Sequence, residues 1–165
     1  MSGRILYERP DGGVSIVCPA QPYDERTGTG TKLTIQEIAA KDVPLGVPYR
    51  IVDSSELPTD RTFRNAWVMS GIAVAVDMTK AREVHREHLR VLRAPVLAAL
   101  DIAFLRAIEA GDVPRQAEIA AQKEALRTVT DDPAIDAATT PDELKAVIPE
   151  ILRRSGAVNV RGEKG

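Results

Sequence analysis

Hydrophobic and polar positions follow different periodicities in the two halves of the chain. Up to residue 76, apolar residues form short runs with β-branched and aromatic side chains, and Gly, Pro and Asp separate these runs. From residue 77 onward, apolar residues recur at spacings of three and four in stretches rich in Ala, Leu, Arg and Glu. The pattern predicts an α+β fold with a β-rich N-terminal domain at 1–76, an α-helical domain at 77–154 and a flexible tail at 155–165.

In the first half, the pattern predicts a β-hairpin followed by a short helix and further strands. Runs at 4–7 and 14–18 flank a Pro-Asp-Gly-Gly turn at 10–13, whose residues tolerate positive φ. Thr34 and Glu37 are spaced as a capping box, in which each side chain bonds a free backbone N–H of the other residue. We therefore expect the following elements after the hairpin: a helix at 35–41, a strand at 49–53 and a short strand or edge segment at 72–76.

The second half predicts an antiparallel helical hairpin or bundle. Its first helix starts after Asp77 and places Ala81, Val84, His88 and Leu92 on one face. Pro95 predicts either a kink in that helix or the start of a new one, because proline removes one backbone bond and clashes with the preceding turn.

Two capping signals predict the remaining helices. Gly111 and Asp112 end one helix and begin the next, which carries Ile119 and Leu126. The sequence Thr-Pro-Asp-Glu at 140–143 combines a capping box with proline at the first helical position. It predicts a final helix that runs to about residue 154.

Composition narrows the classes of function. The formal charge of −2 and the pI near 5.8 provide no positive field for nucleic acid or acidic membranes. A single cysteine, Cys18, excludes an internal disulfide and multi-cysteine zinc sites, and its place in an apolar run predicts inert packing. No apolar run approaches the length of a membrane span, so we expect a soluble protein made in a cytoplasm.

The sequence offers little for catalysis. The glycine-containing loop at 27–31 lacks the Gly-Lys-Ser/Thr ending of a phosphate-binding P-loop. His85 and His88 are three residues apart and do not form the HExxH metal pattern, and we expect His88 on the apolar face and His85 in solvent. Ser54 and Ser55 have no base nearby in sequence. We therefore predict a protein without catalytic residues, cofactor or metal.

An arginine stripe on the first long helix is the first candidate partner surface. Its members are Arg82, Arg86, Arg90 and Arg93, at helical spacing. Acidic residues at 83 and 87 stand beside the stripe. The sequence therefore leaves three alternatives for the stripe: a solvent-exposed face with internal salt bridges, a contact surface for another protein, or a contact with nucleic acid.

The segment at 60–67 is the second candidate and concentrates Arg61, Phe63, Arg64 and Trp67. Arginine and tryptophan are favoured interface anchors because they combine apolar area with directed hydrogen bonds. The alternative is that Phe63 and Trp67, four residues apart, fill the core while the arginines pair with nearby carboxylates. Both alternatives stay open from the sequence.

Four stretches carry a resemblance to a known family. They are Ile-Leu-Tyr at 5–7 with Pro-Asp-Gly-Gly-Val at 10–14, the run at 35–44, Tyr-Arg-Ile-Val-Asp at 49–53, and above all Leu-Pro-Thr-Asp-Arg-Thr-Phe-Arg-Asn-Ala-Trp at 57–67. The chain resembles small proteins encoded among tail and virion-structure genes of tailed bacteriophages. The run at 122–127 also resembles a helix near the C-terminus of tail-fibre assembly proteins.

The resemblance implies a non-enzymatic role that depends on protein–protein contacts. One expectation is a virion structural protein at the tail or neck, made in the host bacterial cytoplasm. Its partners would be other tail, neck or fibre proteins, with homo-oligomeric or ring-arranged copies in the particle. The other expectation is a transient tail-fibre assembly chaperone that is absent from the mature particle.

Overall fold

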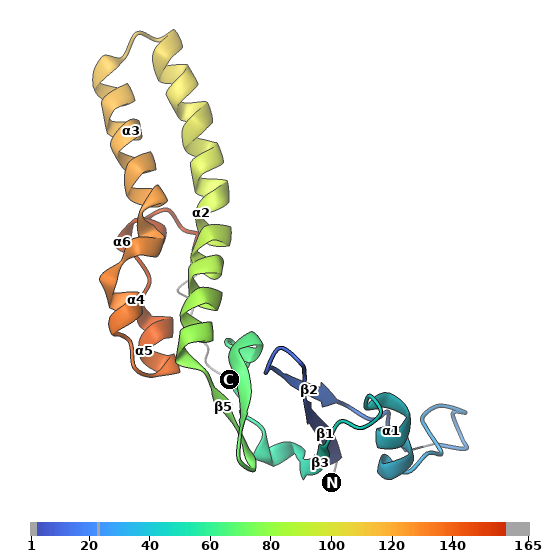
Figure 1. The fold of residues 1–165 in the computed structure, drawn as a ribbon. Helices are drawn as coiled ribbons and strands as arrows, with labels where there is room; N and C mark the ends of the chain where they lie inside the picture. Colours follow the sequence, from blue (N-terminus) through green and yellow to red (C-terminus); the bar gives the residue numbers. More distant parts are fainter. Residues whose placement is uncertain (1–2, 23, 158–165) are drawn as a thin grey trace. The chain divides into compact units, whose positions relative to one another are not determined.

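The computed structural model describes residues 3–22 and 24–157, and it confirms the α+β fold class. The chain divides into two compact units, Met1–Asp77 and Met78–Gly165 (Figure 1). In the first unit the named helices and strands are β1 (Gly3–Glu8), β2 (Val14–Val17), α1 (Ile35–Asp42), β3 (Tyr49–Asp53), β4 (Trp67–Ser70) and β5 (Ala73–Val76). In the second they are α2 (Met78–Glu109), α3 (Val113–Arg127), α4 (Pro133–Ala137), α5 (Pro141–Ala146) and α6 (Glu150–Arg154).

The first unit is built on an antiparallel sheet in the order β2-β1-β3. The predicted hairpin is confirmed, with Leu6 opposite Ile16 on one side. On the other side of β1, the same Leu6 lies opposite Arg50 of β3. Gly12 adopts a φ of 72° in the turn, which a residue without Cβ reaches without strain. The expectation for Cys18 was wrong, because β2 ends at Val17 and the Cys18 side chain is exposed.

Helix α1 covers one face of this sheet. The predicted capping box is present: the Thr34 hydroxyl accepts from the Glu37 N–H at 3.2 Å, and the Glu37 carboxylate accepts from the Thr34 N–H at 2.7 Å. Ile38 and Ala39 then pack with the fully buried Ile5 of β1. Alternation along β1 sends Ile5 to this face and its neighbour Leu6 to the other.

A second hairpin, β4 with β5, packs against the opposite face. Trp67 of β4 is 2% exposed and lies in one cluster with Leu6, Val14, Val52 and Leu57. The sequence predicted β5 but missed β4, because the short apolar run after the aromatic-arginine segment showed no clear period of two. The turn between the two strands uses Gly71 at a φ of 60°.

Helix α2 is continuous through Pro95, which settles the choice left open by the sequence. Pro95 is exposed, so the carbonyl that loses its helical partner lies on a face where water replaces the bond. Helix α3 returns antiparallel beside α2 (Figure 1). The Asp112 side chain accepts from the Arg115 N–H at 3.0 Å and caps the start of α3, as predicted.

The predicted face of α2 was wrong by a fraction of a turn. Ala81, His85 and Leu89 are buried, whereas His88 is exposed. Spacings of four therefore define the packed face at this end of the helix. The two histidines exchange the roles expected from the sequence.

The predicted final helix was also wrong in its extent. Residues 141–154 form two short helices, α5 and α6, separated at 147–149. Pro149 explains the break, since the residue before proline is driven out of the helical region. Leu144 and Leu152 are both fully buried and anchor the two helices. The sequence did not predict α4, and the expected tail at 155–165 lies outside the described residues from 158 onward.

Replacing Trp67 with alanine should destabilise the first unit by about 3–5 kcal/mol, because the side chain fills the cluster between the sheet and the β4–β5 hairpin. Urea unfolding followed by circular dichroism measures the change, with Trp67→Phe as the milder control. A Trp67→Ala midpoint equal to that of the wild type would contradict the core role of this residue.

Candidate protein interface

The segment from Leu57 to Trp67 alternates buried anchors with exposed polar residues. Phe63 is 3% exposed and Trp67 2%, while Arg61 and Arg64 are exposed. This burial favours the core alternative for the two aromatic residues. It leaves the two arginines as the members of the predicted set that face solvent.

Local hydrogen bonds fix the backbone that carries these arginines. The Asp60 carboxylate accepts from the Thr62 N–H at 2.9 Å and from its hydroxyl at 2.7 Å. The Arg64 N–H donates to the Arg61 carbonyl at 3.0 Å, where a single 3-10 turn, η2 (Arg64–Ala66), begins. The segment is therefore an ordered turn held by its side chains and by its buried neighbours.

Neither Arg61 nor Arg64 forms an ion pair with another residue in the part of the chain that the structure describes. The expectation that they pair with nearby carboxylates is thus not met among those residues. An exposed guanidinium with five donors in a fixed fork matches a carboxylate in geometry and charge.

Arg64 and Asn65 also line a small hollow of about 270 Å³ on the first unit. Tyr7 and Arg9 of the first hairpin, together with Ser15, line the same hollow. Arg9 is bonded to Asp11 at 3.1 Å, so one of the two arginines at the hollow is already paired. Sequence reasoning missed Arg9, Tyr7 and Ser15 because strand pairing, not sequence proximity, brings them to Arg64.

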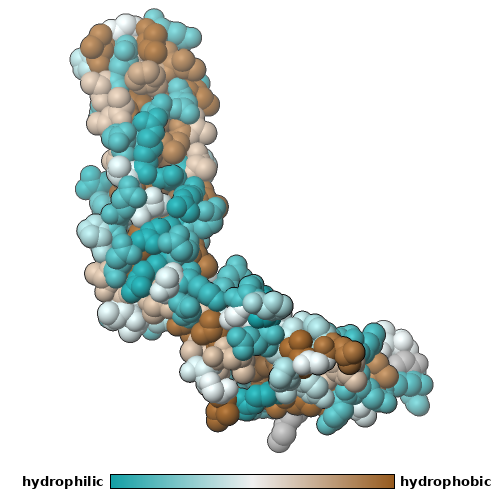
Figure 2. Space-filling model, in the orientation of Figure 1, coloured by the Kyte–Doolittle hydropathy of each residue, from teal (hydrophilic) through white to brown (hydrophobic). Residues whose placement is uncertain are grey.

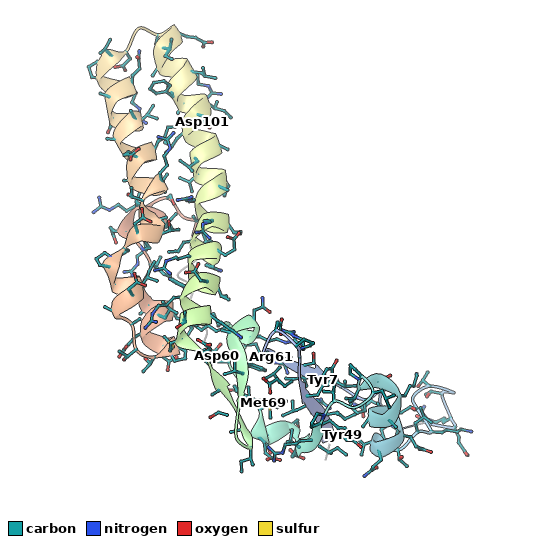
Figure 3. All side chains as sticks on the ribbon, viewed as in Figure 1. Tyr7, Tyr49, Asp60, Arg61, Met69 and Asp101 are labelled. Carbon is teal, nitrogen blue, oxygen red and sulfur yellow. The ribbon has the colours of Figure 1, made fainter. Side chains whose placement is uncertain are left out.

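A larger and more apolar hollow lies elsewhere on the same unit. It encloses about 470 Å³ and is lined by residues that include Tyr7, Tyr49, Arg50 and Met69. Tyr7 and Tyr49 are cross-strand partners in β1 and β3, and Figure 3 labels them with Met69. The Arg50 guanidinium donates to the Ile72 carbonyl in the β4–β5 turn, so its charge is held against the protein itself.

The arginine stripe on α2 has a role that the sequence did not predict. Three of its four members donate hydrogen bonds to backbone carbonyls of the segment that returns along α2. The bonds are Arg82 Nη2 to Ala138 at 2.9 Å, Arg86 Nε to Thr130 at 3.4 Å, and Arg93 Nη1 to Leu126 at 3.2 Å and to Arg127. These carbonyls lie at or just beyond the ends of α3, α4 and the 3-10 turn η3 (Val129–Asp131).

Arg86 has the most partners in the stripe. Its guanidinium pairs with Glu83 and with Asp136, each at 2.6 Å, and its side chain is only 19% exposed. The hydrogen bond to Asp136 is the main cause that raises the pKa of Arg86 above its ordinary value. Arg90, by contrast, pairs among the described residues only with its helical neighbour Glu87, at 3.0 Å, and is 45% exposed. The stripe thus contains inward-facing members and one outward-facing member.

His85 belongs to the same set of donors. Its Nε2 lies 2.8 Å from the Val147 carbonyl, at the break between α5 and α6. Because a carbonyl oxygen only accepts, Nε2 carries the hydrogen in this contact. Burial lowers the pKa of His85 below its ordinary value, with smaller contributions from the charges of His88 and Arg86. His85 is therefore a structural donor at this break.

Among the described residues, no three His, Cys, Asp or Glu side chains gather where they could hold a metal ion. Across the same residues, no helix has both the length and the apolar character that a membrane crossing requires.

Arg86→Ala should destabilise the helical unit by about 1–3 kcal/mol, because it leaves the Thr130 carbonyl and two carboxylates without this donor. Arg90→Ala is the matched control and should change stability by less than about 0.5 kcal/mol, the range typical of an exposed pair. Urea unfolding of both variants measures the difference. Equal effects would contradict an inward structural role for Arg86.

The stability of the helical unit should fall as the pH drops below the ordinary histidine value of 6.5. Because the pKa of His85 is lower in the folded chain than in the unfolded chain, the unfolded chain binds more protons at pH values between the two. Acid therefore favours unfolding. At pH values above both pKa values, the contribution of His85 to the stability of the helical unit is fully present. Urea midpoints between about pH 5 and about pH 8 test this dependence. His85→Gln should remove most of it, whereas His88→Gln, at an exposed position, should not.

No protein-family model matches the sequence, and no curated protein or solved structure matches it. The family suggested by the sequence resemblance therefore stays a prediction.

Proposed function

We propose that the protein is a non-enzymatic structural component of the tail or neck of a tailed bacteriophage, where it joins other virion proteins. The observation that carries this proposal is the pair of exposed arginines, Arg61 and Arg64, held on an ordered turn by the buried Phe63 and Trp67. A rigid turn binds with little loss of conformational freedom, which favours its use as a contact site.

The chemistry of this turn fits an acidic surface on the partner protein. Arg64 lies at the rim of a hollow with a second arginine, Arg9, and with the neutral donors Ser15 and Asn65. A carboxylate that enters the hollow meets several donors and a positive charge, and Arg–carboxylate pairs are strong directed contacts. The distinctive run at 57–67, on which the family resemblance depends most, contains this same turn.

The proposal places copies of the chain in the virion, in a fixed ratio to the ring that they contact. Its partners are other tail, neck or fibre proteins, and the chain is made in the host bacterial cytoplasm before assembly. The role needs no cofactor, because binding and positioning of protein surfaces provide the whole activity.

Quantitative mass spectrometry of density-purified particles beside the crude lysate tests the proposal. We expect a fixed copy ratio between this chain and the portal or major tail protein. Abundance in the lysate with loss from the particles would contradict the structural role and indicate the tail-fibre assembly chaperone instead.

Arg64→Ala should reduce incorporation into particles while leaving the melting temperature of the isolated protein unchanged. The physical reason is that Arg64 is exposed and forms no ion pair with another described residue, so its loss affects a partner more than the fold. Arg26→Ala, at an exposed arginine of the polar loop, is the matched control and should incorporate normally. A large drop in melting temperature with normal incorporation would show that Arg64 serves the fold.

A further inference from the structure

Helix α2 carries a second apolar face that α3 does not cover. The buried and half-buried residues of α2 include Leu89, Val96, Leu100 and Ala107, and they lie on the side that packs within the unit. The residues on the opposite side are exposed, with Val91 64%, Ile102 54% and Leu105 60% exposed. With 3.6 residues per turn, Val91 lies about 200° around the helix from Leu89.

These exposed residues follow a regular spacing. Val91, Ala98 and Leu105 are seven residues apart, and Pro95 and Ile102 lie four residues after the first two. We call the set Val91, Pro95, Ala98, Ile102 and Leu105 the outward face. Figure 2 shows hydrophobic side chains at the surface of α2 toward its connection with α3. A seven-residue repeat with alternating steps of four and three is the pattern by which one helix packs along another in a coiled coil.

Charged residues on the two edges of the outward face identify the partner helix. Asp101 lies immediately before Ile102, and Arg106 lies immediately after Leu105 (Figure 3 labels Asp101). In a parallel coiled coil, these two positions on facing helices are neighbours, five residues apart in sequence. Two parallel copies of α2 in register therefore bring each Asp101 next to Arg106 of the other copy.

Both charges are accessible for this contact. The Asp101 side chain is 59% exposed while it pairs with Lys123 at 2.5 Å through one carboxylate oxygen, which leaves the other oxygen for a second cation. Arg106 is exposed, and among the described residues it forms no ion pair. The small side chain of Ala98 at the centre of the face permits close approach of two helices.

An antiparallel pair does not use these charges. In an antiparallel pair whose two Ala98 residues lie opposite each other, Asp101 lies near Ala94 of the other copy. Arg106 lies near Leu92 of that copy. If one helix shifts along the other by one heptad, the two Ile102 residues lie opposite each other. The two Asp101 side chains then lie together, and like charges repel at such positions. The charges thus favour the parallel arrangement.

We propose that the outward face of α2 binds the same face of a second copy of this chain, with the two α2 helices parallel and in register. The apolar part of the contact runs from Val91 to Leu105, a length of about 21 Å. Two heptads form a short interface, so the dimer is weak, with a Kd of about micromolar or above. The inference does not depend on the virion role, because it concerns the isolated protein in solution.

Sedimentation equilibrium of the full chain tests the dimer over concentrations from about 1 to about 200 µM, which covers weak specific association. We expect a reversible monomer–dimer equilibrium that Ile102→Glu with Leu105→Glu shifts to monomer by at least about tenfold in Kd. Val113→Glu is the matched control, since Val113 is 68% exposed but lies outside the outward face. A wild-type monomer throughout this range, or a dimer that the double variant does not weaken, would overturn the proposal.

A charge-exchange experiment tests whether the partner is a second copy in the parallel orientation. Asp101→Lys and Arg106→Glu should each weaken self-association, because each homodimer then contains two like-charge pairs. An equal mixture of the two variants should regain the wild-type Kd, since the heterodimer contains two opposite-charge pairs. Failure of the mixture to dimerise better than either variant alone would overturn the parallel arrangement.

Disulfide trapping gives a readout that does not depend on the charge variants. In a Cys18→Ser background, Leu105→Cys should form a disulfide-linked dimer under mild oxidation, because the two Leu105 positions face each other in the parallel register and in neither of the two antiparallel arrangements. Val113→Cys in the same background is the control and should cross-link much less. Equal cross-linking at both positions would contradict the proposed register.

Discussion

The short helices that return along α2 end every few residues, and each end leaves backbone carbonyls without intrahelical donors. The helical unit depends on satisfying these carbonyls, because a polar group withdrawn from water without a partner costs free energy. Three arginines of α2 provide donors in antiparallel order: Arg93 at the end of α3, Arg86 at η3 and Arg82 after α4. His85 of the same helix adds a fourth donor after α5. One long helix thus fixes the position of several elements that are too short to be stable alone.

This arrangement also explains why the donors are mostly arginines. A guanidinium reaches from the α2 backbone to a carbonyl and still offers further N–H groups to carboxylates, as Arg86 does with Glu83 and Asp136. Positive charge near a helix C-terminus also interacts favourably with the helix dipole. The same side chains that suggested a surface for a partner therefore hold the unit together.

The surfaces that remain for partners have different chemistry in the two units. In the first unit, Arg61 and Arg64 are exposed on a turn whose aromatic residues are buried, which suits an acidic protein surface. In the second, the outward face of α2 is apolar and has the spacing of a helix–helix contact. The first is the surface that we propose for a different protein, and the second is the surface that we propose for a second copy of this chain.

The α+β class, the first hairpin and the capped starts of α1, α3 and α5 could be predicted from the sequence, because these features depend on residues that are neighbours along the chain. Three features depend instead on contacts between distant segments: α2 passes through Pro95, His85 is buried while His88 is exposed, and residues 141–154 form two helices. A rotation of α2 about its axis by a fraction of a turn decides which of the two histidines is buried. The spacing of apolar residues alone does not fix that rotation. The position of the returning carbonyls fixes it, and those carbonyls come from residues about 30 to 60 positions away in the sequence.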